Sequence, residues 1–397
     1  MGKPKIRFKG FDNDWEQRKL GEIIIEYKET VDSDCTLPIL TSSKTEGVIL
    51  QEEHFGRKQQ HDITGYNILP RNYCTYRNRS DGVDFTFNIN KCCDKGIISK
   101  FYPVFSGNNS DVFFLSLVLN NSEEVVHEIA YTCTGTGQKV LSFLDLQKMK
   151  VRVPSFDEQK KIAAYFDDLD HLITLHQRKC EDTKKLKKYM LQKMFPQNGS
   201  KVPEIRFKGF TDDWEQRKFS EFVNNVARKN KDNLDLEPYA VTNDRGFIAQ
   251  KDAHDDFGYM KETDRRAYNI VPPNSFAYNP ARINVGSLGY YTGSENVIVS
   301  SLYEVFQTED YINARFLWHW LKSNHFPKWI EKLQEGSVRL YFYFDKLVQC
   351  QMMVPTIKEQ KQISTYFDSI DHLITLHQNK CEELKKIKKY MLQNMFV

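Results

Sequence analysis

Two segments of this chain occur twice, and this duplication limits the folds that the chain can adopt. Residues 6–19 and 205–218, which lie 199 positions apart, are identical at 12 of 14 positions. Residues 158–195 and 359–396, which lie 201 positions apart, are identical at 28 of 38 positions. Between these copies only scattered residues agree, although the two intervening stretches differ in length by only two residues. We therefore expect one scaffold that is built twice and carries two different surfaces.

The second repeated segment has the pattern of a long helix that packs along one face. Its seam positions alternate by four and three residues over roughly five heptads, which is typical of a coiled coil. Pro154 and Pro355 precede the two helices, and residues 196–200 (PQNGS) form a linker after the first. The seam positions are Ile162, Phe166, Leu169, Ile173, His176, Cys180, Thr183, Lys187, Met190 and Met194 in the first copy, and Ile363, Phe367, Ile370, Ile374, His377, Cys381, Leu384, Lys388, Met391 and Met395 in the second.

We expect the two helices to pack on each other in antiparallel fashion, because two repeats favour a closed two-fold arrangement over an open stack. A helix of 38 residues is roughly 57 Å long at 1.5 Å per residue. DNA rises about 3.4 Å per base pair along each strand, so two domains on a rod of that length would bracket roughly 16 base pairs of DNA at most. The pairing would also bring His176 near Cys381 and Cys180 near His377. We interpret these four side chains as core residues, so no metal site is predicted.

The diverged stretches predict mixed α/β domains of related fold. Strands are indicated at 39–42, 66–69, 112–119, 268–271 and 296–306, and helices at 123–131 and 311–330. The expected class is α+β, with two mixed domains separated by a pseudo-two-fold pair of long antiparallel coiled-coil helices. The expected segments are 1–155, 156–196 (the central helix), 197–356 and 357–397 (the C-terminal helix).

Composition narrows the function classes. The net charge is only +3, so any binding of nucleic acid must rely on local patches. The chain has neither a transmembrane run nor a signal-peptide pattern, and its eight cysteines show no CxxC spacing. We therefore expect a reduced, cytoplasmic protein.

Catalytic motifs are not evident in the sequence. There is no Gly-rich phosphate loop ending in GK[ST], and His127-Glu128 lacks the second histidine of a zincin site. The stretch 278–281 (YNPA) has only a faint likeness to a methyltransferase motif, and we interpret it as a loop. We expect a non-catalytic chain without a cofactor of its own.

Two pairs of loops are candidates for recognition. The turns at 135–139 and 336–340 occupy equivalent positions before the long helices, and their small residues permit close approach of the backbone. The stretches 75–79 and 277–284 combine arginine, asparagine and an aromatic residue, a set that suits reading of bases in the major groove. Plain surface loops are the alternative interpretation. The candidates are Thr136, Gln138, Lys139, Ser337 and Arg339 in the turns, Tyr76, Arg77, Arg79, Tyr278, Asn279, Arg282 and Asn284 in the stretches, and Lys44, Asn243 and Arg245 in two weaker loops.

The residues that lead into the long helices carry a resemblance to a known family. Residues 153–162 (VPSFDEQKKI) and 354–363 (VPTIKEQKQI) each run on into YFD…DHLITLHQ. Together with the Gly-[Ser/Thr] turn ahead of each block, they resemble the specificity subunit of type I restriction–modification systems. The resemblance spans the whole chain. The first copy departs from the second at the turn, with Gly137 and Gln138 in place of Val338 and Arg339.

The resemblance implies that 1–155 and 197–356 are target-recognition domains for the two halves of an asymmetric, bipartite DNA sequence. It also implies docking of two adenine-methyltransferase subunits and of restriction subunits. Those partners would hold S-adenosylmethionine, ATP and Mg. A standalone bipartite DNA-binding regulator and a scaffold for two protein partners, without DNA, are the alternatives.

Overall fold

The chain folds into two compact units in the computed structural model, which describes residues 4–57, 62–82, 84–135, 137–197, 199–243, 246–253, 264–337 and 339–396. Unit 1 comprises Met1–Gln177 with Asn379–Val397, and unit 2 comprises Arg178–Gln378. The division crosses both long helices, α6 (Phe156–Lys193) and α11 (Ile357–Met395). Each unit therefore contains the first part of one long helix and the last part of the other. These two units are defined by which residues pack together, whereas the four expected segments are defined by the sequence repeat.

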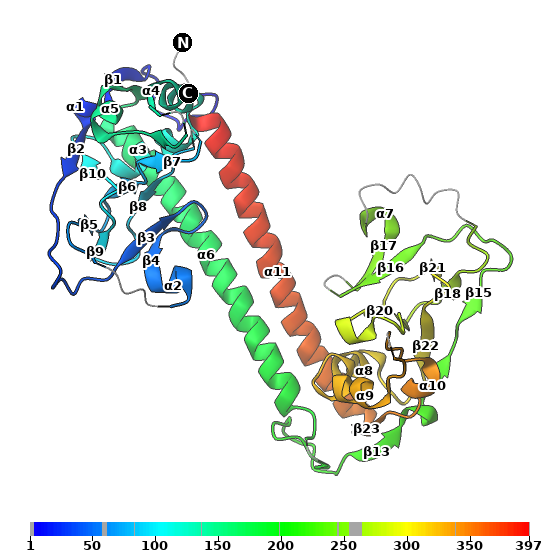
Figure 1. Ribbon diagram of the computed structural model, residues 1–397. Coiled ribbons are helices and arrows are strands. Elements are labelled where there is room, and N and C mark those ends of the chain that lie inside the picture. The colour runs from blue at the N-terminus through cyan, green and yellow to red at the C-terminus, as the bar shows by residue number, and fades with distance from the viewer. Residues whose placement is uncertain are drawn as a thin grey trace. The chain divides into compact units, whose positions relative to one another are not determined.

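A four-stranded antiparallel sheet lies in each unit (Figure 1). Its order in unit 1 is β2 (Ile24–Tyr27), β10 (Val104–Gly107), β6 (Cys74–Tyr76) and β8 (Phe87–Ile89). Its order in unit 2 is β14 (Val223–Asn225), β22 (Glu304–Thr308), β19 (Ser275–Tyr278) and β20 (Leu288–Tyr291). Ranked along the chain, both orders are first, fourth, second and third. The diverged stretches therefore share one topology, as the length match of the repeat predicts.

Shorter strands and helices complete each unit. Unit 1 adds β1 (Glu16–Lys19), α1 (Leu20–Ile23), β3 (Leu40–Ser43), β4 (Gly47–Leu50), α2 (Gln51–Phe55), β5 (Asn67–Pro70), β7 (Arg79–Ser80), β9 (Lys95–Ile98), α3 (Val112–Asn121), α4 (Glu123–Thr132), β11 (Lys139–Val140), α5 (Phe143–Lys148) and β12 (Lys150–Val153). Unit 2 adds β13 (Glu215–Lys218), η1 (Phe219–Glu221), β15 (Arg228–Lys229), β16 (Tyr239–Thr242), β17 (Gly246–Ala249), α7 (Gln250–Ala253), β18 (Asn269–Val271), η3 (Ile283–Val285), β21 (Val297–Val299), α8 (Ala314–Leu321), α9 (His325–Leu333), α10 (Phe344–Leu347) and β23 (Gln351–Val354).

The two long helices pack in antiparallel fashion within each unit. In unit 1, the Phe166 and Phe396 rings lie 6.0 Å apart and Asp170 pairs with Lys388 at 2.5 Å. In unit 2, the equivalent rings of Phe367 and Phe195 lie 6.2 Å apart, and Asp371 pairs with Lys187 at 2.5 Å. Residue numbers rise along one helix as they fall along the other, so the predicted antiparallel pairing is confirmed. The same contacts recur 201 residues apart.

The predicted seam is buried along most of its length. Its apolar side chains join the main hydrophobic core of each unit, so the long helices stabilise the diverged domains as well as each other. None of the helices in the described part of the chain has the length and apolar character needed to cross a membrane. The buried seam residues include Ile162, Phe166, Leu169, Ile173, Cys180, Ile363, Phe367, Ile370, Cys381, Leu384 and Met395.

An arginine of the first repeated segment is locked to a glutamate of the second in each unit. Arg7 donates to both carboxylate oxygens of Glu158, at 2.6 and 2.7 Å, and the Glu158 side chain is 0% exposed. Arg206 makes the same two-bond contact with Glu359, at 2.8 and 2.9 Å. A two-bond arginine–carboxylate pair holds both partners in one orientation. The two repeated segments therefore recur together because they contact each other.

The glutamine after each buried glutamate attaches the diverged domain to its long helix. The Gln159 amide oxygen accepts from the Ser110 hydroxyl at 2.6 Å and from the Asp111 backbone N–H at 3.0 Å. The Gln360 amide oxygen accepts from the Asn313 backbone N–H at 2.8 Å. Asp111 and Asn313 are the N-cap residues of α3 and α8. Each glutamine thus positions the start of a domain helix beside the start of a long helix.

The sequence prediction was wrong for one buried segment. Residues 112–119, predicted as a strand, form most of α3. A short, continuously apolar run has no period that separates strand from helix. The N-cap decides the outcome here, since the Asp111 carboxylate accepts from the Phe114 backbone N–H at 2.8 Å.

Two longer predictions each proved to be two elements. The expected strand at 296–306 is divided into β21 and β22, and the expected helix at 311–330 into α8 and α9. The expected helix at 123–131 is confirmed as α4.

Arg7→Ala leaves the Glu158 carboxylate buried without its cationic partner. We expect unit 1 to lose about 3 kcal/mol of unfolding free energy, the usual consequence of breaking a buried ion pair from one side. Chemical denaturation followed by tryptophan fluorescence measures the loss. Arg18→Ala is the matched control, because the Arg18–Glu22 pair is exposed (43% and 51%) and its loss should change stability by less than about 1 kcal/mol. Equal effects of the two substitutions would contradict this role of the buried pair.

Candidate nucleic-acid interface

In unit 1 the fold brings the two main predicted loops side by side. β7 pairs with β11, with Ser80 opposite Lys139 and Arg79 opposite Val140. The Gln138 side-chain amide also donates to the Asp81 carboxylate at 3.4 Å. The turn at 135–139 and the stretch at 75–79, which the sequence suggests separately, therefore form one surface.

Unit 2 contains the equivalent pair of loops. Glu335 bridges Tyr341 across the base of the turn, and the Phe342 backbone N–H donates to the Pro280 carbonyl oxygen at 3.0 Å. In unit 1 the Leu141 backbone N–H makes the corresponding bond to the Asn78 carbonyl, also at 3.0 Å. Both units thus present the turn beside the arginine- and asparagine-containing stretch.

Each turn requires glycine at its first position. Gly135 and Gly336 have φ angles of +105° and +131°, in the region that disfavours L side chains. A Cβ at Gly135 would lie 2.3 Å from the Gln138 carbonyl oxygen, and one at Gly336 would lie 1.9 Å from the Arg339 carbonyl oxygen. The backbone therefore closes tightly on itself in both turns, and this sets the direction of the side chains that follow.

Most of the candidate recognition residues reach the surface, but two do not. Tyr76 and Tyr278 are 0% exposed, and the Tyr76 hydroxyl donates to the Leu141 carbonyl oxygen at 3.1 Å. These two rings support the loops from below, out of reach of a ligand. Thr136 and Arg245 lie outside the described residues. The exposed candidates are Lys44, Arg77, Arg79, Gln138, Asn243, Arg282, Asn284, Ser337 and Arg339, and the half-buried ones are Lys139 and Asn279.

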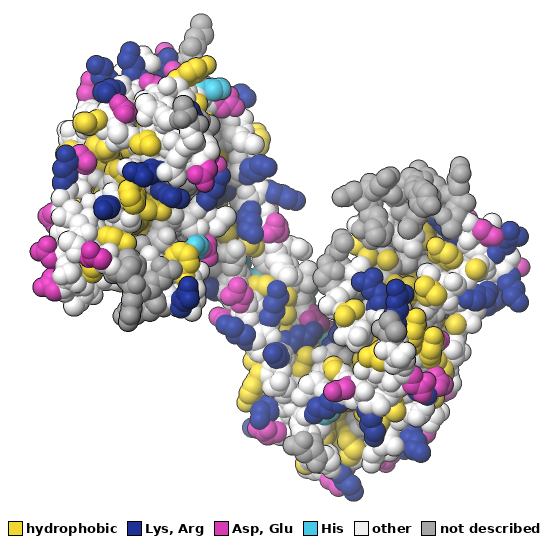
Figure 2. All heavy atoms as spheres, in the orientation of Figure 1, with side chains coloured by type: hydrophobic (Ala, Val, Ile, Leu, Met, Phe, Trp, Pro, Cys, Tyr) yellow, Lys and Arg dark blue, Asp and Glu magenta, His cyan; other side chains and the backbone are white. Residues whose placement is uncertain are grey.

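Some of the exposed candidates have partners within the chain. Lys44 pairs with Asp84, and the Arg79 guanidinium lies 4.5 Å from the centre of the Phe101 ring. On the face drawn in Figure 2, basic and acidic side chains are interspersed over both units. This distribution agrees with the small net charge and with local rather than global attraction of an anion.

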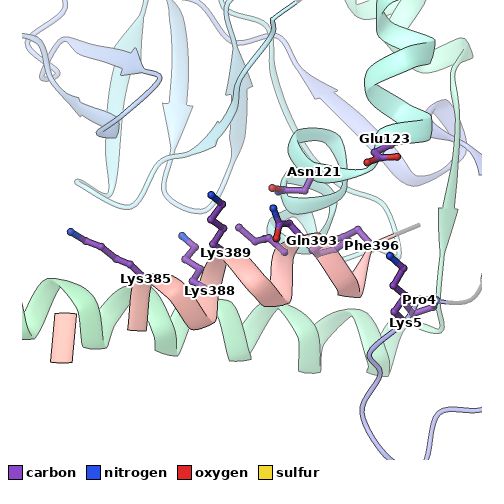
Figure 3. A pocket seen from close by; sticks show the side chains of 10 residues that line it. Pro4, Lys5, Asn121, Glu123, Lys385, Lys388, Lys389, Gln393 and Phe396 are labelled. Carbon is purple, nitrogen blue, oxygen red and sulfur yellow. The ribbon is translucent and has the colours of Figure 1, made fainter. Parts of the chain in front are cut away.

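A hollow in each unit was missed by the sequence analysis. In unit 2 it measures about 1000 Å³ and includes Asn243, one of the predicted recognition residues, together with Lys322. In unit 1 a hollow of about 640 Å³ includes Lys5 and Asn121 (Figure 3). Lysines of a long helix line both: Lys184, Lys187 and Lys188 of α6 in unit 2, and Lys385, Lys388 and Lys389 of α11 in unit 1. The sequence shows these lysines in both repeats, but their pattern is equally that of a solvated helix face.

Lys322 in the unit 2 hollow is partly shielded from water. Its ammonium lies 4.6 Å from the centre of the Trp318 ring and donates to the Leu288 carbonyl oxygen at 3.3 Å. Burial, with a further contribution from the nearby Lys187, lowers the pKa of Lys322 to about 8. A bound anion would favour the charged form of this side chain.

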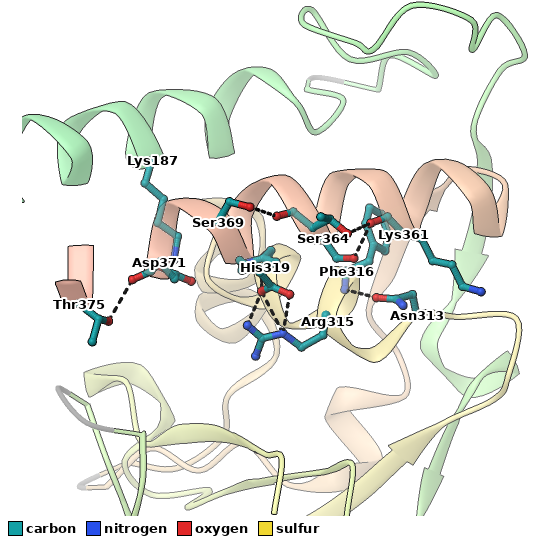
Figure 4. Close-up of polar contacts among 12 residues, drawn as sticks. Lys187, Asn313, Arg315, Phe316, His319, Lys361, Ser364, Ser369, Asp371 and Thr375 are labelled. Atoms are coloured by element: carbon teal, nitrogen blue, oxygen red, sulfur yellow. Dashed lines mark hydrogen bonds and ion pairs between the residues drawn. The ribbon is translucent and has the colours of Figure 1, made fainter. Parts of the chain in front are cut away.

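A network of charges attaches α8 to α11 beside this hollow (Figure 4). Asp368 accepts from the Arg315 guanidinium at 3.0 Å and from His319 Nε2 at 2.8 Å. Burial alone would raise the pKa of the Asp368 carboxyl, but hydrogen bonds from His319 and Arg315 outweigh it and hold the pKa at about 2. Burial lowers the pKa of His319, whose Nδ1 has no partner among the described residues.

One cluster has the residue types of a metal site. Among the described residues, only His319, Asp368 and Asp371 bring three such ligand atoms within 4.8 Å of one another. Arg315 and Lys187 already pair with the two carboxylates, so protein cations occupy the positions that a metal ion would need. Of the predicted His–Cys layer, Cys180 and Cys381 are buried, and its interpretation as core stays a prediction.

A known protein family matches the chain twice, once in each half of the repeat. Residues 12–182 and 211–386 match the family described as "Type I restriction modification DNA specificity domain". Two curated proteins of Methanocaldococcus jannaschii are similar. The type I restriction enzyme MjaVIII specificity subunit is 25% identical over 282 residues, which are 65% of this chain and 64% of that protein. The putative MjaX specificity subunit is 24% identical over 276 residues, or 64% and 60%. The match thus spans less than two thirds of either relative.

A solved structure agrees at the level of the fold. The crystal structure of the type I restriction–modification S subunit from M. genitalium superposes with a TM-score of 0.59, covering 100% of this chain and 99% of that one. The sequence identity is 12%, so the likeness supports the fold alone.

Gly135→Ala should distort the turn, because the new Cβ would meet the Gln138 carbonyl oxygen at a positive φ angle. We expect a loss of at least about 1 kcal/mol in unfolding free energy. Gly137→Ala, in the same turn, is the control, since a Cβ there would meet nothing within 4 Å. Its effect should stay within about 0.5 kcal/mol. Urea unfolding measures the loss of unfolding free energy in both variants. A larger loss in Gly137→Ala than in Gly135→Ala would contradict the geometry of the turn.

Lys322 should make the stability of unit 2 depend on alkaline pH. Its pKa is about 8 in the folded chain, against an ordinary value of 10.5, so folding disfavours its charged form. The resulting destabilisation is complete below pH 8 and disappears as pH rises to about 10.5. Lys322→Met should therefore raise the unfolding temperature most at pH 7, and the gain should shrink toward pH 10. A pH-independent difference between the two proteins would contradict the lowered pKa.

Proposed function

We propose that this chain, which belongs to the family of type I restriction–modification DNA specificity domains, is the DNA-recognition subunit of a type I complex. Each unit would read one half of an asymmetric, bipartite target. The observation that carries this proposal is the combination of an identical framework with different exposed turns. Both units share the sheet order and the buried arginine–glutamate pair, whereas Gln138 and Lys139 in one turn stand where Arg339 and Leu340 stand in the other.

The paired loops are the proposed base-reading surface of each unit. In unit 2, Arg339 and Arg282 can offer two donors to a guanine, and Asn284 can pair with an adenine. Asn243, in the neighbouring weaker loop, lines one pocket with Asn284 and can pair with an adenine as well. Arg77 and Gln138 are the corresponding exposed candidates in unit 1. The tight turns support this assignment, because a closed backbone limits the freedom that these side chains would lose on binding. Thr136 and Arg245 remain candidates on the sequence alone.

The long helices are the proposed docking platform for the methyltransferase subunits, one for each half. Apolar side chains stay exposed along both helices even though the seam itself is filled. Exposed apolar surface on an otherwise charged helix favours a protein partner. The exposed residues are Leu172, Leu186, Tyr189, Leu373, Leu376, Ile387 and Tyr390.

We assign the chemistry to these partners rather than to this chain. The methyltransferase subunits would hold S-adenosylmethionine and methylate adenine, and restriction subunits would use ATP and Mg. The eight cysteines are all free thiols, which is consistent with work in the cytoplasm. The mixed surface charge is consistent with partners that contribute to holding the duplex.

Co-expression with a type I methyltransferase subunit, followed by sequencing of methylated adenines, tests the proposal. We expect an asymmetric motif of two short half-sites with a fixed gap. Tight, specific DNA binding by the chain alone, without any methylation, would instead indicate a standalone regulator. A complex whose assembly and activity are independent of DNA would indicate a protein scaffold.

Arg339→Ala should relax the motif at one half-site only. Loss of a two-bond arginine contact to guanine costs about 1–3 kcal/mol of discrimination, or roughly 5- to 150-fold. The same sequencing assay reads the outcome base by base. Arg228→Ala is the control, because Arg228 is an exposed arginine of unit 2 on β15, which pairs with β18 and belongs to neither of the paired loops. Equal loss at both half-sites would show that Arg339 acts on folding or on phosphates instead.

A further inference from the structure

The same three lysines line a hollow in each unit. Lys184, Lys187 and Lys188 of α6 lie 201 positions before Lys385, Lys388 and Lys389 of α11. We call each set a lysine face. The surfaces across the hollows differ. Unit 2 presents Tyr239, Phe247, Tyr290, Tyr291 and Trp318, whereas unit 1 presents Pro4, Lys5, Asn121 and Glu123. A repeated cationic surface opposite two unrelated walls points to a ligand feature that both units share.

One lysine of each face has a structural role. Lys187 pairs with Asp371, and Lys388 pairs with Asp170, each at 2.5 Å. All four side chains are partly buried, with 18–42% of their surface exposed. These pairs join the two long helices. Their charges are therefore largely compensated within the protein.

The positive charges of the other two lysines of each face are at most weakly neutralised by ion pairs within the protein, so they are available to a ligand. Among the described residues, no carboxylate lies within ion-pairing distance of Lys184, Lys188 or Lys389. Lys385 forms a surface pair with Glu382 of its own helix, at 2.9 Å, and such pairs are weak. Each face thus offers two exposed ammonium groups, four residues apart on one side of a helix.

The geometry of these two groups suits a row of phosphates. Four residues of α-helix rise about 6 Å, while successive phosphates of one DNA strand rise about 3.4 Å along the axis. Two ammonium groups can therefore contact phosphates of the same strand. Figure 3 shows Lys385, Lys388 and Lys389 projecting from the same side of α11.

The unit 2 face lies beside the proposed base-reading surface. Asn243, a proposed reader of bases, lines the same hollow as Lys184 and Lys188. Lys322, whose ammonium is partly shielded from water beside the Trp318 ring and whose charged form a bound anion would favour, lines it as well. A strand whose bases reach Asn243 would thus have its backbone within reach of the lysine face.

We propose that the two lysine faces bind the sugar–phosphate backbone of the target duplex, independently of its sequence, and so position each unit for base reading. This inference rests on the proposed function and adds a role for the long helices beyond spacing and docking. Phosphate contacts fix the register of a protein on DNA, while base contacts supply the specificity. The repeated lysines would supply the phosphate contacts, and the diverged loops would supply the base contacts.

The test uses the complex of the full chain with its methyltransferase subunit. The variants are Lys184→Gln with Lys188→Gln, and separately Lys385→Gln with Lys389→Gln. Binding to a target duplex and to an unrelated duplex of equal length is measured by fluorescence anisotropy between 50 and 200 mM salt. Each lost phosphate contact should lower the slope of log affinity against log salt by about 0.9. Over this fourfold salt range, wild-type affinity should therefore fall about 12-fold more than that of either double variant.

A matched control removes the same number of charges from the neighbouring side of the same helices. Lys185→Gln with Lys386→Gln changes two exposed lysines that are 201 positions apart and line neither hollow. Its salt slope should stay close to that of wild type. Circular dichroism should show unchanged helix content in all variants, because glutamine has nearly the helix propensity of lysine.

The outcomes separate this inference from the proposed function. Equal slopes for the lysine-face variants and the control would overturn the inference. So would loss of the methyltransferase subunit with an unchanged DNA slope, since the faces would then bind protein. A reduced slope on the unrelated duplex supports phosphate binding even if wild type shows no preference for any target, a result that would contradict only the proposed function.

Discussion

The buried pairing of an arginine with a glutamate is the contact on which the architecture depends. Arg7 with Glu158 and Arg206 with Glu359 join an N-terminal segment to the start of a long helix some 150 residues away in the chain. The glutamates are 0% and 1% exposed, so neither carboxylate is tolerable there without its partner. This requirement fixes where each recognition domain begins relative to its helix, and the glutamine that follows fixes the domain helix beside it.

The long helices make each unit depend on both halves of the sequence. Phe396, at the end of the second copy, packs against Trp15, Phe114 and Phe166 in unit 1. Phe195, at the end of the first copy, makes the equivalent contacts with Trp214, Phe316 and Phe367 in unit 2. Each core is completed by a helix that begins in the other unit. Such an exchange lets the surface loops diverge freely, because the shared helices carry the packing.

The repeated framework also lets different contacts serve the same purpose. The aspartate of each YFD sequence attaches its domain to its helix, but Asp167 pairs with Lys91, whereas Asp368 pairs with Arg315 and His319. The cations come from different elements, since Lys91 follows β8 and Arg315 lies on α8. The helix side of the contact is therefore constant and the domain side is variable, which is the same division seen in the lysine faces and the recognition loops.

The sequence by itself determined the duplication, the long helices, their antiparallel seam and the family resemblance, because these depend on local periodicity and on direct comparison of two copies. It could not determine that residues 112–119 form a helix, since a continuously apolar run is compatible with either structure until its cap is known. Nor could it show that Tyr76 and Tyr278 are buried while their neighbours are exposed. Only the tertiary structure decided which loops meet, which half of each helix completes which core, and that the repeated lysines line hollows. Those facts depend on contacts between residues far apart in the chain, which no local pattern encodes.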